Sequence, residues 1–156
     1  AGGTTALEAM QKKSAELGYK PAIFSKNLQG LASEIGPKLA ETVKPGEALL
    51  ACGETTVIVK KPGKGGRNQD LALSALPYLK KDSAIVSAAS DGKDNIDVAG
   101  GITDSNSYLE SSENIEPVKA VANNESFEAL RKINGIFHIN KVTANVSDFI
   151  VVLRKE

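Results

Sequence analysis

The chain has 156 residues, of which 41% are hydrophobic and 24% are charged, as is usual for a globular domain. Its 19 basic and 19 acidic residues balance, and only 4% of the residues are aromatic, so a nucleic acid is a poor candidate for a partner. One cysteine gives no internal disulfide, and no apolar run approaches the roughly 20 residues that span a bilayer. We therefore expect a cytoplasmic protein with no membrane partner. Because the chain does not begin with methionine, we also expect a fragment or a processed product.

Apolar residues alternate between helical and strand-like spacing along the chain. Helices are predicted over residues 5–17, 28–43, 68–79, 104–109, 117–121 and 126–133, and strands over residues 19–24, 47–52, 55–60, 84–89, 136–139 and 149–153. Pro37 should kink or divide the second helix, and Pro77 should bend the end of the third. This alternation predicts one α/β domain over residues 1–156, with three α/β/α layers and a mixed, mostly parallel sheet.

A glycine-rich stretch joins the third predicted strand to the third predicted helix. Its sequence is Gly-Lys-Gly-Gly-Arg-Asn-Gln over residues 63–69. Glycines let the backbone approach a ligand, the start of a helix offers N–H groups to an anion, and Arg67 adds a bidentate contact to phosphate or carboxylate. A flexible turn with a solvated basic tip is the alternative interpretation. The stretch is neither a Walker A loop nor a dinucleotide fingerprint, because it lacks the closing Lys-Ser/Thr and the third glycine.

A second polar loop follows the fourth predicted strand and carries three carboxylates, Asp91, Asp94 and Asp97. Carboxylates at the end of a strand can hold Mg²⁺, orient a hydroxyl or act as a general base. They also form ordinary Asx turns, which is the alternative here. Glu54 and Thr55 stand between two predicted strands, where a simple β-turn is the alternative to a functional role.

Taken together and in order, these stretches resemble the C-terminal domain of the glycerate 2-kinase family, known as the MOFRL domain. The family's Gly-Gly-Glu-Thr-Thr-Val corresponds to residues 52–57, and its Gly-Arg-Gly-Gly-Arg-Asn-Gln-Glu-Leu-Ala-Leu corresponds to residues 63–73. Its Thr-Asp-Gly-x-Asp corresponds to residues 90–94, its Asp-Ala-Ala-Gly to residues 97–100, and its Asn-Val-x-Asp to residues 145–148. The resemblance covers most of the chain. Residues 140–146 depart from it, because they lack both glycines and the proline of the family's Gly-Pro-Thr-Gly-Thr-Asn-Val.

The resemblance implies a phosphotransferase with an alcohol acceptor, which uses ATP and Mg²⁺ or a similar divalent cation to convert D-glycerate to 2-phosphoglycerate. It implies three catalytic residues: Arg67 stabilises phosphate charge, Asp91 orients or deprotonates the hydroxyl or holds the metal, and Glu54 gives polar support. The residues that it implies for substrate and phosphate binding are Gly65, Gly66, Asn68, Gln69, Thr55 and Gly92.

The resemblance also implies that the site lies in a cleft between this domain and a larger N-terminal domain, which is absent from these residues. We therefore expect the N-terminal domain of the same enzyme and glycerate as partners, and little or no activity from this chain alone; a homo-oligomer is left open. The altered residues 140–146 favour an alternative, a non-catalytic domain that binds anions, nucleotides or another protein. A third possibility, hydroxypyruvate reductase, is disfavoured because the dinucleotide motif is missing.

Overall fold

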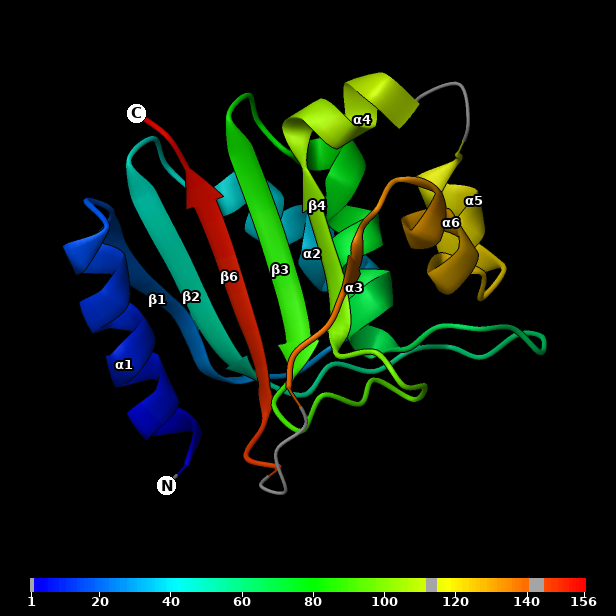
Figure 1. The fold of residues 1–156 in the computed structure, drawn as a ribbon, viewed down its shortest axis with the longest axis horizontal. Helices are drawn as coiled ribbons and strands as arrows, with labels where there is room; N and C mark the ends of the chain where they lie inside the picture. Colours follow the sequence, from blue (N-terminus) through cyan, green and yellow to red (C-terminus); the bar gives the residue numbers. More distant parts are fainter. Residues whose placement is uncertain (1, 112–114, 141–144) are drawn as a thin grey trace.

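The computed structural model describes residues 2–111, 115–140 and 145–156, in which helices cover a central sheet (Figure 1). The described strands are β1 (Lys20–Leu28), β2 (Glu47–Gly53), β3 (Ser83–Ala89), β4 (Gly100–Asp104), β5 (Ile136–Phe137) and β6 (Asp148–Arg154). The described helices are α1 (Gly3–Glu16), α2 (Ala32–Thr42), α3 (Arg67–Ala75), α4 (Ser105–Ser111), α5 (Pro117–Ala122) and α6 (Ser126–Lys132), and a 3₁₀ turn, η1 (Leu76–Tyr78), extends α3. None of the helices in these ranges is long and apolar enough to cross a membrane.

The strands of the described residues form one mixed sheet in the order β1-β2-β6-β3-β4-β5. Only β1 and β2, which α2 connects, are parallel, and every other neighbouring pair of these strands is antiparallel. The predicted α/β class with a mixed sheet is confirmed, but its mostly parallel character is wrong. Two of the antiparallel pairs arise because β6, which comes last in the chain, lies between β2 and β3 and runs opposite to both, and β3–β4 and β4–β5 are the others. The spacing of apolar residues does not reveal the insertion of β6.

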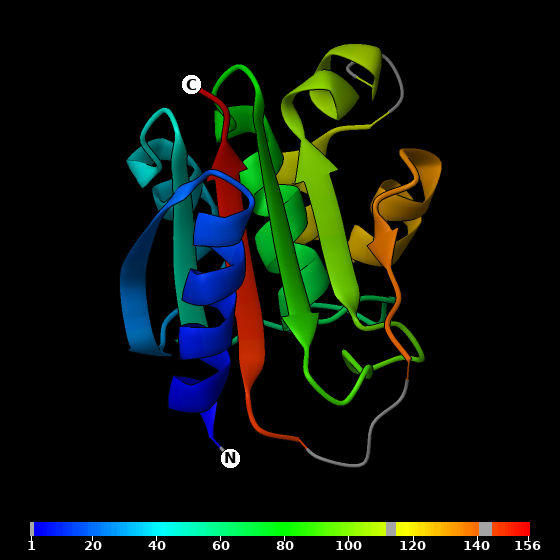
Figure 2. The same ribbon diagram turned by 60° about the vertical axis from the view of Figure 1, so that its left-hand side comes forward.

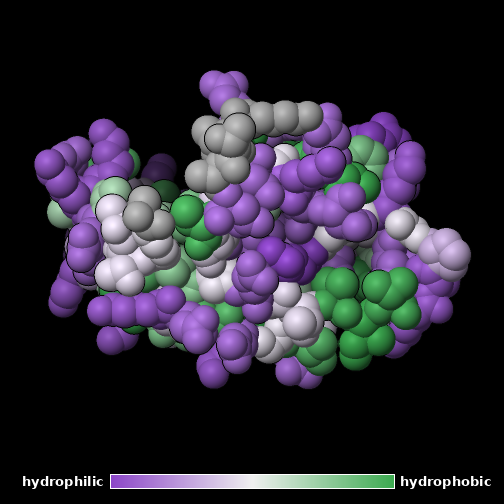
Figure 3. All heavy atoms as spheres, turned by 90° about the horizontal axis from the view of Figure 1, so that it is seen from below, coloured by the Kyte–Doolittle hydropathy of each residue, from purple (hydrophilic) through white to green (hydrophobic). Residues whose placement is uncertain are grey.

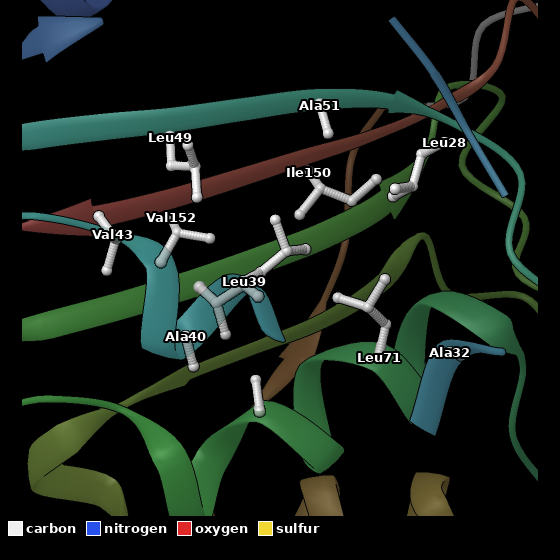
Figure 4. Packing of buried hydrophobic residues seen from close by; sticks show 12 residues of the cluster. Leu28, Ala32, Leu39, Ala40, Val43, Leu49, Ala51, Leu71, Ile150 and Val152 are labelled. Carbon is white, nitrogen blue, oxygen red and sulfur yellow. The ribbon is translucent and has the colours of Figure 1, made fainter. Parts of the chain in front are cut away.

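The two faces of the sheet bury alternate residues of the same strand. In β2, Leu49 and Ala51 pack with α2 and α3, whereas Leu50 and Cys52 pack on the other face against Leu7 of α1. This period of two is expected for a strand that is covered on both faces. Figure 4 shows the first of these cores, in which side chains of α2 and α3 meet those of β2 and β6. Figures 1 and 2 show α1 on one face and α2 and α3 on the other, which confirms the three layers.

Most predicted elements exist with shifted ends, but the strand predicted over residues 55–60 does not. Within this segment only Thr56 pairs with another strand-like residue, in an isolated parallel bridge to Leu31. Ile58 and Val59 are 58% and 73% exposed, so their β-branched side chains cover no neighbouring strand. The alternation that predicted a strand lies instead in an extended loop.

The two prolines inside predicted helices have different effects. Pro37 lies within α2, which continues as one helix to Thr42 and is not divided. The helix predicted from Leu28 begins later, at Ala32, because Leu28 is the last residue of β1. Pro77 lies within the 3₁₀ turn that follows α3, so the predicted change at the end of this helix is confirmed.

Candidate active site

Three loops meet at one end of the sheet, the lower edge in Figure 1. They are residues 54–66 after β2, residues 90–99 after β3, and the described residues just before β6. The strand register explains why they meet: Asp148, the first residue of β6, pairs with Gly53 at the end of β2 and with Ala89 at the end of β3. Because β6 is antiparallel to both neighbours, its first residue lies beside their last residues. This end therefore gathers the stretches that carry the family resemblance.

A cleft of about 590 Å³ opens between the first two loops, within the range of roughly 300–1,000 Å³ that is typical of small-molecule sites. Its lining is formed by Thr55, Thr56, Val57, Val59, Lys61, Pro62, Gly63, Gly65, Gly66, Arg67, Asp70, Lys93, Asp94, Asn95 and Asn124. Three of these residues, Lys61, Arg67 and Lys93, are cations, and two, Asp70 and Asp94, are buried carboxylates. Figure 3 shows this end of the molecule, where polar side chains occupy the middle and an apolar group stands at one side.

Arg67, the first residue of α3, is held by carboxylates from two other parts of the chain. Its Nε and Nη2 donate to the two carboxylate oxygens of Asp148, the second at 3.0 Å, and its Nη2 lies 3.7 Å from Oε1 of Glu54. The Asp148 side chain is 2% exposed and that of Glu54 is 61% exposed, so the pair with Asp148 is the stronger. The hydrogen bond with Asp148 raises the pKa of Arg67, and burial acts in the opposite direction. The guanidinium is thus a fixed positive charge at the cleft.

The start of α3 is closed by a carboxylate from the loop after β3. The buried Asp94 accepts hydrogen bonds from the backbone N–H groups of Asn68 and Gln69, at 3.2 and 3.0 Å. The side-chain amides of the same two residues donate to this carboxylate at 3.2 and 3.0 Å. A Cβ at Gly66 would overlap the Asp94 carboxylate, so this glycine makes room for a protein side chain. Burial raises the pKa of Asp94, against the hydrogen bonds from Gln69 and Asn68, which lower it.

A second buried carboxylate, Asp70, lies next along α3. Burial raises its pKa to about 6, the neighbouring hydroxyl of Ser126 lowers it, and the charge of Asp94 raises it further. A Cβ at Gly65 would overlap the Ser126 hydroxyl and would lie 3.7 Å from Oδ1 of Asp70, so these groups are close neighbours. A carboxylate that titrates near neutral pH inside a cleft is typical of functional sites.

The outer wall of the cleft, residues 57–63, is fixed by the side chain of Asn124. Its Oδ1 accepts hydrogen bonds from the backbone N–H groups of Lys60 and Lys61, at 2.8 and 3.3 Å. Its Nδ2 donates to the backbone carbonyl of Ile58 at 3.0 Å. The wall therefore rests on the connection between α5 and α6, although it belongs to no strand.

The structure brings five of the predicted site residues together at the cleft. Thr55, Gly65, Gly66 and Arg67 line it, and the carboxylate of Glu54 reaches Arg67. The two glycines touch protein groups there, so their absent side chains are explained by packing. Their contact with a phosphate stays a prediction.

The other four predicted site residues lie outside the lining of the cleft. Asn68 and Gln69 are buried, and their backbone and side-chain donors bind the carboxylate at the start of α3. Asp91 and Gly92 lie in a turn after β3, in which Oδ1 of Asp91 accepts a hydrogen bond from the backbone N–H of Lys93 at 2.9 Å. The catalytic and binding roles of these four residues stay predictions.

Sequence reasoning named Asp94 among three candidate carboxylates without giving it a specific role, and it missed Asp70, Asn124 and Asp148 as parts of the site. The three aspartates stand inside the stretches that carry the family resemblance, which was the available signal. Asn124 lies outside those stretches, and no local pattern indicates its role. Most of the altered loop at residues 140–146 lies outside the described residues, because 141–144 are not among them.

Comparison with known proteins finds relatives over nearly the whole chain. Residues 47–148 match the model of the MOFRL family. The chain is 33% identical to a glycerate 2-kinase of Pyrococcus horikoshii, in a match that covers 98% of the chain and 38% of that protein. It is 35% identical to a D-glycerate 2-kinase of Thermotoga maritima, in a match that covers 88% of the chain and 36% of that protein. A crystal structure of glycerate kinase from Thermotoga maritima superposes on 99% of the chain with a TM-score of 0.91, at 31% identity and over 41% of that structure's chain. The chain thus spans little more than a third of the length of these curated relatives.

Proposed function

This chain belongs to the MOFRL family, and we propose that it forms the C-terminal part of the active site of a glycerate 2-kinase. The proposed reaction transfers the γ-phosphoryl group of ATP to the 2-hydroxyl of D-glycerate. A bond forms between the hydroxyl oxygen and the γ-phosphorus, the bond from that phosphorus to ADP breaks, and the hydroxyl proton is released. Relatives named glycerate 2-kinase in two organisms support this assignment.

The observation that carries the proposal is the fixed guanidinium of Arg67. Negative charge on the transferred phosphoryl group is stabilised by cations that are already in position. Asp148 and Glu54 hold Arg67 from two sides, so little reorganisation is needed when a phosphate enters the cleft. Lys61 and Lys93 line the same cleft and add positive charge to it.

We propose Asp91 as the group that orients the glycerate hydroxyl or contributes to holding Mg²⁺. Bound Mg²⁺ would neutralise phosphate charge. Within the described ranges no three His, Cys, Asp or Glu side chains come together as a metal site. A donor set of one carboxylate with nucleotide phosphates and water is nevertheless usual for Mg²⁺, and the partly exposed Asp91 fits that set.

We propose further that an N-terminal domain of the same enzyme completes the site. Support comes from the relatives, of which this chain matches only 38% and 36% of the length. The cleft also opens at the end of the domain where three loops meet, so a second domain has a face on which to close over it. The 156 residues alone are then expected to show little or no turnover.

The test is glycerate- and Mg²⁺-dependent consumption of ATP by the full-length enzyme, with phosphorus NMR to distinguish 2-phosphoglycerate from 3-phosphoglycerate. Arg67→Ala should lower kcat by roughly 10²–10³-fold, as for the loss of other positioned groups that stabilise transition-state charge. Arg131→Ala is the matched control, because Arg131 is an exposed arginine that pairs with Glu128 on α6. An Arg67→Ala enzyme as active as the wild type would refute the site. Binding of ATP without turnover of any hydroxy acid would favour the non-catalytic alternative.

A further inference from the structure

Two N–H donors in the first turn of α3 are already bound to a carboxylate of the protein itself. The first N–H groups of a helix have no partner within the helix, which makes them a common site for anionic ligands. In α3 the N–H groups of Asn68 and Gln69 are such donors, and both bind the carboxylate of Asp94. With the two side-chain amides, four N–H groups converge on this one carboxylate.

Surrounding groups fix this arrangement from several sides. The hydroxyl of Ser87 in β3 donates to Oδ1 of Asn68, which leaves the NH₂ group of that amide for Asp94. The side chain of Gln69 also donates to the backbone carbonyl of Asp94, at 3.2 Å. Ser87, Asn68, Gln69 and Asp94 are all buried, and Gly66 leaves the space that the carboxylate fills. The contact is thus part of the interior and not a surface cap.

We propose that Asp94 is a positioning residue for Arg67, an inference that rests on the proposed function of Arg67. Asp94 binds the N–H groups of the two residues that directly follow Arg67, so it fixes the backbone from which the guanidinium extends. Asp148 fixes the other end of the same side chain. The N–H groups of Asn68 and Gln69 are occupied by Asp94, and that of Asp70 is bound to the carbonyl of Gly66. The phosphate is therefore recognised by the side-chain cations of the cleft and not by these three N–H groups.

The chemistry of the contact requires a carboxylate. All four groups that face Asp94 are N–H donors, so both of its oxygens must accept. Asp94→Asn keeps the shape of the side chain but turns an NH₂ group toward two of these donors. Packing alone would tolerate the amide, whereas positioning of α3 by a carboxylate would not.

The first experiment uses the full-length enzyme and a double-mutant cycle. Asp94→Asn is expected to lower kcat by about tenfold or more and to change the KM for glycerate by less than about threefold. In the Arg67→Ala background the same substitution should change kcat by less than about threefold, because residues that act as one unit are not additive. If the two effects multiply, Asp94 acts independently of Arg67 and the proposal is wrong.

The second experiment does not depend on turnover. Asp94→Ala leaves a space of carboxylate size in front of the same four donors, and formate should fill it. Formate should raise the Tm of Asp94→Ala in a concentration-dependent way and restore part of the turnover, while chloride at equal ionic strength should do neither. The Tm of the wild-type enzyme should not respond to formate. If Asp94→Ala does not fold, the cycle with Asp94→Asn decides alone.

The two experiments separate failure of the inference from failure of the proposed function. If the wild-type enzyme phosphorylates glycerate but formate changes neither the Tm nor the turnover of Asp94→Ala, the role of Asp94 is refuted and the kinase stands. If the wild-type enzyme does not act on glycerate but formate stabilises Asp94→Ala, the proposed function fails. In that case Asp94 still fixes the start of α3, but Arg67 has no catalytic role for it to support.

Discussion

Replacing Asp70 by asparagine should stabilise the domain at neutral pH. Asp70 is 6% exposed, and burial raises its pKa from 3.8 to about 6, with the charge of Asp94 adding to the effect and Ser126 opposing it. An ionised carboxylate in such a place is costly to bury. Asparagine has nearly the same shape and carries no charge, so it avoids that cost.

The magnitude follows from the difference in pKa between the folded and unfolded states. A shift from 3.8 to about 6 corresponds to about 3 kcal/mol, since one pKa unit is about 1.4 kcal/mol. Because the folded pKa is the higher one, the stability gained from this proton is fully present below about pH 4 and is lost as the pH rises through about 6. The free energy of unfolding of Asp70→Asn, relative to wild type, should therefore rise by up to ~3 kcal/mol from about pH 4 to about pH 7 and stay level above.

Urea denaturation of the 156-residue chain, followed by circular dichroism over this pH range, measures that difference. Ser126→Ala is the informative companion, because it removes the neighbouring hydroxyl that lowers the pKa of Asp70. It should move the midpoint of the pH dependence upward, and it should have no such effect in the Asp70→Asn background. A difference between Asp70→Asn and wild type that is independent of pH would refute the assignment of a costly buried charge at this position.

Three further comparisons test the contacts of the cleft and of the end of β2 by urea denaturation or proteolysis. Asp148→Ala should cost about 1.5–3 kcal/mol, since it removes charged hydrogen bonds from a guanidinium that stays a third exposed and keeps Glu54 nearby. Removing the exposed Glu54 should cost less than about 1 kcal/mol, and equal costs would contradict this ranking. Gly53→Ala should destabilise the fold more than Gly18→Ala. Both glycines have a positive φ (150° and 88°), but only at Gly53 would a Cβ overlap the backbone of β1. Asn124→Ala should speed proteolysis within the outer wall of the cleft with little change elsewhere, and unchanged cleavage there would show that other contacts hold the wall.

The spacing of apolar residues along the chain predicted most of the helices and strands, but it failed for β4 and for residues 55–60. β4 contains Gly100 and Gly101, which have low strand propensity, so its sequence gave no strand signal. In the fold a Cβ at Gly101 would lie 2.9 Å from the side chains of Ala72 and Leu130, so glycine is what lets α3 and α6 approach the sheet. The opposite error concerns residues 55–60, for which a strand was predicted and none forms. Their β-branched residues alternate with the period of a strand, but no neighbouring strand packs beside them.

In the site, too, some features follow from neighbouring residues in the chain and others only from contacts made in the folded structure. Arg67 was predictable because its neighbours in the chain carry a specific motif. The rule that the start of a helix binds an anion was also physically sound, since α3 does bind one. That anion is Asp94, which lies 26 residues beyond Asn68 in the chain, and only the folded structure shows that the protein supplies it. Whether a helix start is offered to a ligand or is used internally depends on tertiary contacts. For the proposed reaction, we therefore expect the side chains around Arg67 to recognise the phosphate.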